Sequence, residues 1–151
     1  MRILGIDYGT KRIGLALSDE SGSFAFPLKV ISQPSTSDVD GWSGEIREIC
    51  EKNDVRKIVL GRPGGYKGDP SKILEKIEKF KMVIERETGR PVVYENEVLT
   101  TQQARRPAKA NQPRGRISNY RGSTSIVKNI DASAAALILQ CYLDRSSNML
   151  E

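Results

Sequence analysis

Three short apolar runs occupy the start of the chain before any helical pattern begins. They predict strands over residues 3–7, 13–18 and 28–31, separated by turns rich in Gly, Ser and Thr. Connections this short favour antiparallel neighbours, because a parallel crossover needs a dozen or more residues. We therefore expect the chain to open with an antiparallel meander.

After residue 31 the apolar residues recur every three to four positions, which is the period of a helix. The predicted elements are, in order, a helix over 39–49 capped by Asp38, a strand over 58–60, a helix over 71–88 ended by Gly89, a strand over 91–94, a short helix over 100–104 and a last helix starting at Asp131. Strands that alternate with helices are usually parallel. We predict a single α/β domain over residues 1–151: a mixed five-stranded sheet, three strands antiparallel and then two parallel, with helices on both faces.

Composition excludes several classes of protein. The 151 residues include no histidine, which removes Ser/His/Asp triads and histidine-based zinc sites. Cys50 and Cys141 lie far apart in sequence and fall in helical patterns, so we expect two buried, reduced thiols. No apolar run approaches the roughly 18 residues of a membrane span, and the strand at residue 3 leaves no room for a signal peptide. These features predict a cytoplasmic protein without a membrane partner.

Positive charge is concentrated in one segment. The net charge is +5, yet residues 98–130 contain seven Lys and Arg and no acid, so the remainder carries about −2 (5 − 7). The segment is poor in large apolar residues, and we expect a flexible basic loop at about 105–130. A solvated linker is one interpretation; a flap that gathers nucleic-acid phosphates, with Tyr120 available to stack on a base, is the one we prefer. The arginines assigned to substrate binding are Arg105, Arg106, Arg114, Arg116 and Arg121.

Three acids stand at the ends of predicted elements. Asp7 ends the first strand, Glu97 follows the fifth, and Asp131 begins the last helix. Taken singly, they read as a turn aspartate, a loop glutamate and a helix N-cap. Taken together beside a basic loop, they match the hard oxygen ligands that Mg²⁺ or Mn²⁺ needs for phosphodiester hydrolysis. We therefore predict Asp7, Glu97 and Asp131 as catalytic and metal-binding residues.

The same residues lie in motifs that resemble a known family. Residues 5–14 (GIDYGTKRIG), 96–101 (NEVLTT) and 131–140 (DASAAALILQ) are similar, in this order, to the YqgF family of RNase H-like proteins. The resemblance implies an RNase H-like fold and a metal-dependent nuclease, with the same three acids as ligands. It favours 5′-end processing of precursor 16S rRNA, with ribosomal precursor particles as partners, over cleavage of branched DNA as a Holliday junction resolvase. Thr10, Lys11 and Arg12, just past Asp7, are expected to contact substrate phosphates.

The chain departs from the family pattern at three places. Asn96 replaces the usual Asp, Val98 replaces the usual Arg, and the loop over 62–70 (RPGGYKGDP) differs from the usual version. These changes motivate one alternative, a catalytically weak module that binds RNA or ribosomes. Another, an ATP-binding fragment of the sugar-kinase or actin type, rests only on the turn after Asp7. A monomer and a homodimer both remain open.

Overall fold

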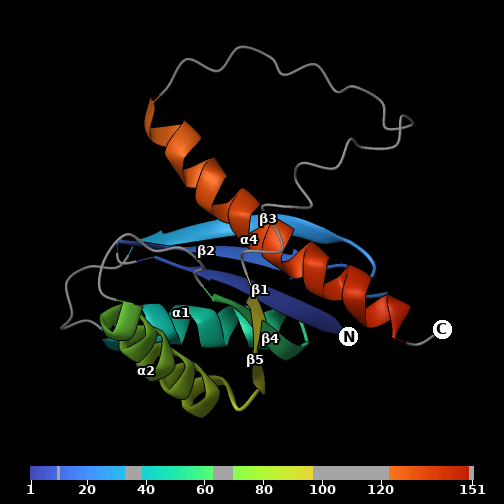
Figure 1. Cartoon of the computed structure of the whole chain (residues 1–151), viewed down its shortest axis with the longest axis horizontal. Helices are drawn as coiled ribbons and strands as arrows, with labels where there is room; N and C mark the ends of the chain where they lie inside the picture. Colours follow the sequence, from blue (N-terminus) through green and yellow to red (C-terminus); the bar gives the residue numbers. More distant parts are fainter. Residues whose placement is uncertain (10, 33–38, 63–69, 97–122, 150–151) are drawn as a thin grey trace.

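The computed structural model describes residues 1–9, 11–32, 39–62, 70–96 and 123–149. Its five strands form one mixed sheet in the order β3-β2-β1-β4-β5 (Figure 1). The strands are β1 (Arg2–Tyr8), β2 (Arg12–Ser18), β3 (Ala25–Ser32), β4 (Val55–Arg62) and β5 (Val92–Asn96). β2 pairs antiparallel with both β1 and β3, whereas β4 pairs parallel with both β1 and β5. The predicted sheet, three antiparallel strands followed by two parallel ones, is confirmed.

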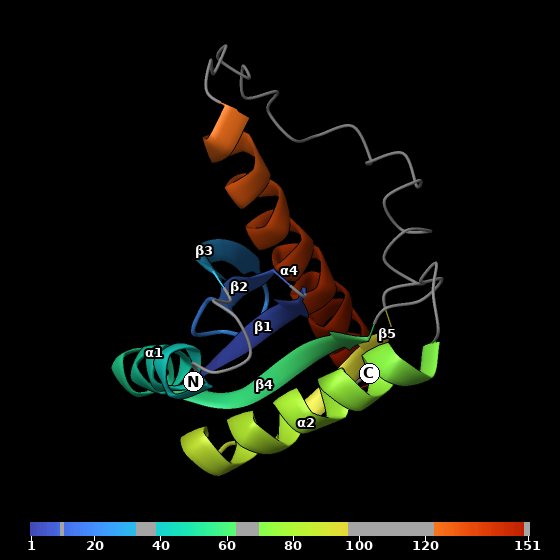
Figure 2. The ribbon, with the colours of Figure 1, turned by 90° about the vertical axis from the view of Figure 1, so that its left-hand side faces the viewer.

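Helices cover both faces of this sheet. They are α1 (Val39–Lys52), α2 (Pro70–Thr88) and α4 (Ser123–Asn148). Figure 2 shows α4 on one side of the sheet, with α1 and α2 on the other. This arrangement confirms the predicted α/β architecture. Within the described part of the chain, no helix is long and apolar enough to cross a membrane.

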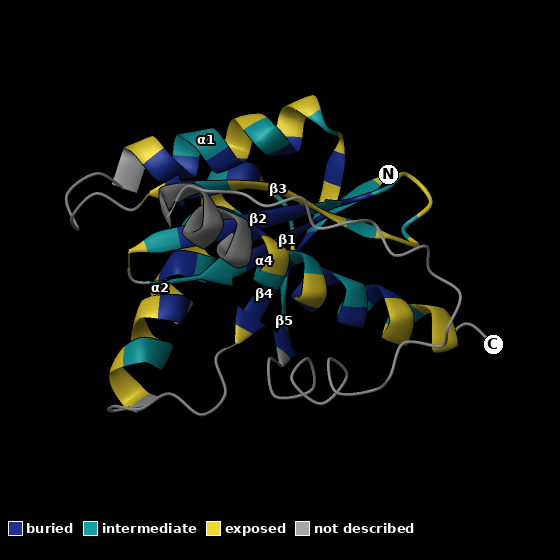
Figure 3. Ribbon diagram, turned by 90° about the horizontal axis from the view of Figure 1, so that it is seen from above, coloured by how far each residue is buried: buried dark blue, intermediate teal, exposed yellow. Residues whose placement is uncertain are grey.

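The sheet separates two apolar clusters. The larger joins Leu4 and Ile6 of β1 to Ile46 of α1 and Ile84 of α2, all fully buried. The smaller lies under α4, where Leu139 packs with residues of the central strands. Successive side chains of a strand point to opposite faces, so a sheet buried on both faces needs apolar residues at consecutive positions. Figure 3 shows such continuous buried stretches in the central strands.

A helix end and a turn between strands are formed by the residue types that favour them. Gly89 follows α2 with φ of 66°, and its amide donates to the carbonyl oxygen of Glu85 at 2.9 Å, as expected of a C-cap glycine. Between β2 and β3, the Asp19 carboxylate accepts hydrogen bonds from the backbone amides of Ser23 (2.8 Å) and Phe24 (3.1 Å). Both cysteines are buried and free, which confirms that prediction.

The start of the last helix was predicted wrongly. α4 begins at Ser123 rather than at Asp131, so residues 123–130, expected as the end of the basic loop, are helical. The apolar residues of this stretch, Ile126, Val127 and Ile130, have helical spacing, and serine is a favoured residue at a helix start. The positive charge and the Ser/Thr content hid this pattern. The predicted helix at 100–104 and the remainder of the basic loop lie outside the described residues.

Candidate active site

Asp7 lies near the end of β1, half-buried, on the sheet face that α4 covers. Ile3 packs against the cluster under α4, whereas Leu4 and Ile6 belong to the cluster under α1 and α2. By strand alternation Asp7 shares the face of Ile3. The β1 residues before it on this face are Ile3 and Gly5, so an acid at Asp7 is unusual for a core strand and marks this end of the sheet as a candidate site.

Glycine occupies the positions beside Asp7 in both neighbouring strands. Gly14 of β2 pairs directly with Asp7. Gly61 of β4 follows Leu60, which is the partner of Ile6. Because neither position contributes a side chain, the sheet surface flanking the carboxylate is backbone. Glycine inside a strand often marks a place where a ligand approaches the backbone closely.

The turn after Asp7 is sterically restricted to glycine at one position. A Cβ atom on Gly9 would lie 2.5 Å from the carbonyl oxygen of Arg12, a contact that real side chains do not make. This close turn sets the path of the chain between β1 and β2. Of the residues predicted to contact substrate here, Lys11 is exposed and Arg12 is half-buried, while Thr10 lies outside the described residues.

α4 approaches β1 closely next to Asp7. A Cβ atom on Gly5, two residues before Asp7, would lie 2.7 Å from the Cβ of Leu139 and 3.0 Å from the carbonyl oxygen of Ala135. The side-chain oxygen of Gln140 accepts a hydrogen bond from the amide of Ala25 (2.9 Å). Ala25 begins β3 and lies level with the start of β1, because it pairs with Ser18, and Leu17 pairs with Leu4. Residues of α4 that precede Ala135 therefore lead away from the start of β1.

The backbone of α4 carries Asp131 one turn before Ala135. Four helical residues rise about 6 Å, so the backbone of Asp131 lies about 6 Å along α4 from the residue that contacts Gly5. Because α4 begins at Ser123, Asp131 lies inside the helix, and its reading as an N-cap is wrong. Its side chain is outside what the structure describes.

The second predicted ligand, Glu97, directly follows β5 and lies outside the described residues, as do the five arginines assigned to substrate binding. Within the described ranges, no group of three acidic or cysteine side chains is placed to hold a metal ion. The metal site and its three ligands therefore stay predictions.

A buried ion pair on the same face was not predicted from the sequence. Glu95 of β5 is 2% exposed and pairs with Arg145 of α4. Glu95 is also the register partner of Gly61, which places it in the same row of the sheet as Asp7. The predicted strand stopped at Tyr94; its extension by one residue, with Val93 and Glu95 on one face by the period of two, was the signal that could have found the pair.

Comparison with known proteins gives a family match along almost the whole chain. The family model described as "RuvX: Holliday junction resolvase" matches residues 1–145. Two relatives named "Putative pre-16S rRNA nuclease" are similar over nearly their full lengths. The protein from Syntrophus aciditrophicus is 40% identical over 150 residues, covering 97% of this chain and 91% of the relative. The protein from Caldanaerobacter subterraneus is 38% identical over 149 residues, covering 98% and 99%.

A solved structure has the same fold. The Thermus thermophilus RuvC chain, described in complex with a Holliday junction substrate, aligns with a TM-score of 0.58 at 15% identity, covering 97% of this chain and 96% of that one. A second chain, described as "Thermus thermophilus RuvC structure", aligns with a TM-score of 0.55 at 17% identity, covering 98% of this chain and 97% of that one. Identity this low shows the fold alone, and that fold agrees with the predicted RNase H-like sheet.

Proposed function

The chain belongs to the RuvX family, and from that premise we propose that it is a metal-dependent nuclease that processes the 5′ end of precursor 16S rRNA. The observation that carries the proposal is the position of Asp7. This half-buried acid lies on a glycine-flanked surface at the end of β1, under the helix that carries Asp131.

The described backbone supports convergence of the three acids. Asp7 and the α4 residues before Ala135 lie on the same face, because Gly5 contacts α4 and leaves no room for a side chain. In the sequence, Glu97 follows Val93 and Glu95 at the two-residue spacing of one strand face, and Val93 and Glu95 face α4. β1 and β5 are two strands apart, or about 10 Å. Side chains from these positions can bridge such a gap through bound cations.

The predicted donors suit a hard divalent cation. All three are carboxylates, and the chain has no histidine to favour zinc. Asp7, Glu97 and Asp131 would hold Mg²⁺ or Mn²⁺, which would supply Lewis acidity for phosphodiester hydrolysis. Lys11 and Arg12, with Thr10 and the arginines between 105 and 121, would bind and orient the phosphates of the substrate.

The names of the relatives favour RNA as the substrate, since both similar proteins carry the name "Putative pre-16S rRNA nuclease". Cleavage of a four-way DNA junction is the second candidate, because the matching family model is described as a Holliday junction resolvase. A junction resolvase cuts two strands symmetrically and so favours a dimer, whereas trimming of an RNA end works equally well with a monomer.

The test is cleavage by purified protein, with Mg²⁺, of a precursor 16S rRNA fragment and of a four-way DNA junction. We expect cleavage of the RNA fragment and its loss in Asp7→Asn. Asp54→Asn is the matched control, because Asp54 is an exposed acid at the opposite end of the sheet with φ of 50°, which Asn adopts readily. Wild-type activity in Asp7→Asn would refute the proposed site. Cleavage of the junction alone would replace the RNA assignment.

A further inference from the structure

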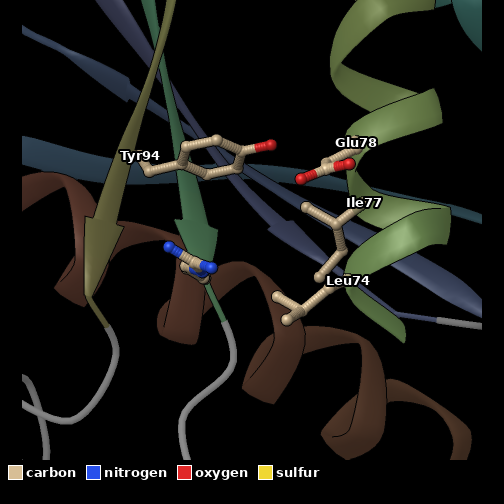
Figure 4. A pocket seen from close by; sticks show the side chains of 5 residues that line it. Leu74, Ile77, Glu78 and Tyr94 are labelled. Atoms are coloured by element: carbon tan, nitrogen blue, oxygen red, sulfur yellow. The ribbon is translucent and has the colours of Figure 1, made fainter. Parts of the chain in front are cut away.

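An open pocket lies on the sheet face opposite Asp7, between α2 and the ends of β4 and β5. Arg62, Leu74, Ile77, Glu78 and Tyr94 line it (Figure 4); its cavity volume is about 50 Å³, and it opens to solvent. Leu74 and Ile77 form an apolar wall, Tyr94 contributes an aromatic ring, and two charged groups of opposite sign complete the lining. This combination is typical of sites for flat, polar-edged rings.

Two cations lie near the face of the Tyr94 ring. The guanidinium carbon of Arg62 is 5.8 Å from the ring centroid and the Lys81 ammonium is 5.1 Å away. A ring inserted between Tyr94 and Arg62 needs about 6.8 Å, which is twice the roughly 3.4 Å spacing of stacked bases. Because Arg62 is an exposed side chain at the end of β4, its guanidinium can move out by this ~1 Å.

The carboxylate of Glu78 selects the kind of ring. Glu78 supplies carboxylate oxygens that accept hydrogen bonds, so the pocket suits a ring with N–H groups on its edge. Guanine presents two adjacent N–H donors, which match the two oxygens of a carboxylate. Adenine and cytosine present an amino group beside an acceptor, and uracil presents one N–H between two carbonyls. Burial raises the pKa of Tyr94, with Glu78 raising it further, so its phenol stays a hydrogen-bond donor.

We propose that this pocket binds one unpaired guanine base of the substrate strand, stacked between Tyr94 and Arg62 and hydrogen-bonded to Glu78. The proposal rests on the proposed nuclease function, because the base belongs to the RNA that is cut. The register supports it: Tyr94 pairs with Leu60, and Leu60 with Ile6, the residue before Asp7. The register therefore brings the backbones of Tyr94 and Ile6 to one end of the sheet, about 10 Å apart, but the pocket and Asp7 lie on opposite faces, so a substrate strand that reaches both passes around this end of the sheet.

The first experiment measures binding of GMP and AMP by calorimetry without divalent cations. We expect GMP to bind at least tenfold more tightly than AMP. Glu78→Gln should abolish that preference, whereas Glu75→Gln, which removes an exposed acid one turn earlier on α2, should retain it. Arg62→Ala should weaken both nucleotides, and Arg56→Ala, at the start of β4, neither. Equal binding of GMP and AMP by the wild type, or an unchanged preference in Glu78→Gln, would overturn the proposal.

The second experiment separates this site from the nuclease function. A dodecamer of uridines with one guanosine should bind more tightly than the all-uridine strand in both the wild type and Asp7→Asn. If RNA is cleaved but the guanosine gives no advantage, the pocket proposal fails and the function stands. If the guanosine is preferred but Mg²⁺ supports no cleavage, the function fails and the pocket stands.

Discussion

Replacing Gly5 by alanine tests how closely α4 must approach β1. The added Cβ would lie 2.7 Å from the Cβ of Leu139 and 3.0 Å from the carbonyl oxygen of Ala135. Carbon atoms pack best at about 3.5–4.0 Å, so the helix must move out by roughly 1 Å. Overpacking of this kind costs about 1–3 kcal/mol. For a domain of this size about 2 kcal/mol corresponds to a loss of roughly 4–8 °C in Tm.

The assay is thermal unfolding followed by circular dichroism, with Gly44→Ala as the matched control. Gly44 lies in α1, and a Cβ there would meet nothing within 4 Å. Alanine is favoured over glycine in a helix by about 0.5–1 kcal/mol, so this variant should melt higher than the wild type. Leu139→Ala should not rescue Gly5→Ala, because the contact involves the Cβ that alanine keeps. A Gly5→Ala protein as stable as the wild type would refute the reasoning.

Three further predictions concern residues outside the candidate ligands. Arg145→Gln leaves the buried Glu95 carboxylate without its ion-pair partner. We expect the free energy of unfolding in urea to fall by about 1–3 kcal/mol, which is less than the loss for a fully buried ion pair because Arg145 is half-exposed. An unchanged urea midpoint would contradict this expectation. Hydrogen bonds from the Ser21 hydroxyl and the Phe24 amide lower the pKa of Asp19. The contribution of Asp19 to stability is therefore complete above its ordinary pKa and is lost as the pH falls through the lowered pKa. Asp19→Asn should be less stable than the wild type at pH 7, by a smaller difference near pH 3, and a difference that does not change with pH would disprove the linkage. Burial raises the pKa of Cys50 to about 11, so iodoacetamide at pH 8 should label it only after unfolding, and rapid labelling of the folded protein would show an accessible thiolate.

The strand pairing of the sheet could be predicted because it follows from the lengths of the connections between neighbouring elements. Turns too short for a crossover impose antiparallel pairing on β1, β2 and β3, and the later alternation of helix and strand imposes parallel pairing on β4 and β5. The C-cap at Gly89 was also predictable, since it depends on one residue and its backbone angle. Strand ends were less predictable: β3 begins at Ala25, three residues before the predicted start.

The start of α4 and the ion pair of Glu95 depend on longer-range features. Polar and basic residues near Ser123 resemble the preceding loop, although Ile126 and Ile130 keep the helical spacing. Nothing local pairs Glu95 with Arg145, which lies 50 residues away and meets it only when α4 packs on the sheet. The base pocket is equally non-local, because Tyr94 and Arg62 come from different strands and Glu78 comes from a helix.

The candidate site residues could be named from the sequence, whereas their positions relative to one another come only from the fold. Asp7 was singled out as an acid at the end of a buried strand, and the structure adds that Gly14 and Gly61 flank it. Asp131 was singled out as an acid at the start of a predicted helix, although α4 begins eight residues earlier and Asp131 lies inside it. Convergence of the three acids depends on how segments far apart in sequence pack, and it stays a prediction.

The most direct test of the account is calorimetric titration of Mn²⁺ into the wild type and into Asp7→Asn, Glu97→Gln, Asp131→Asn and the control Asp54→Asn. A shared site predicts that each of the first three substitutions weakens cation binding by at least tenfold, because each removes a carboxylate ligand, while the control binds like the wild type. Cation affinity that is unaffected by any one of these three substitutions would contradict the shared site.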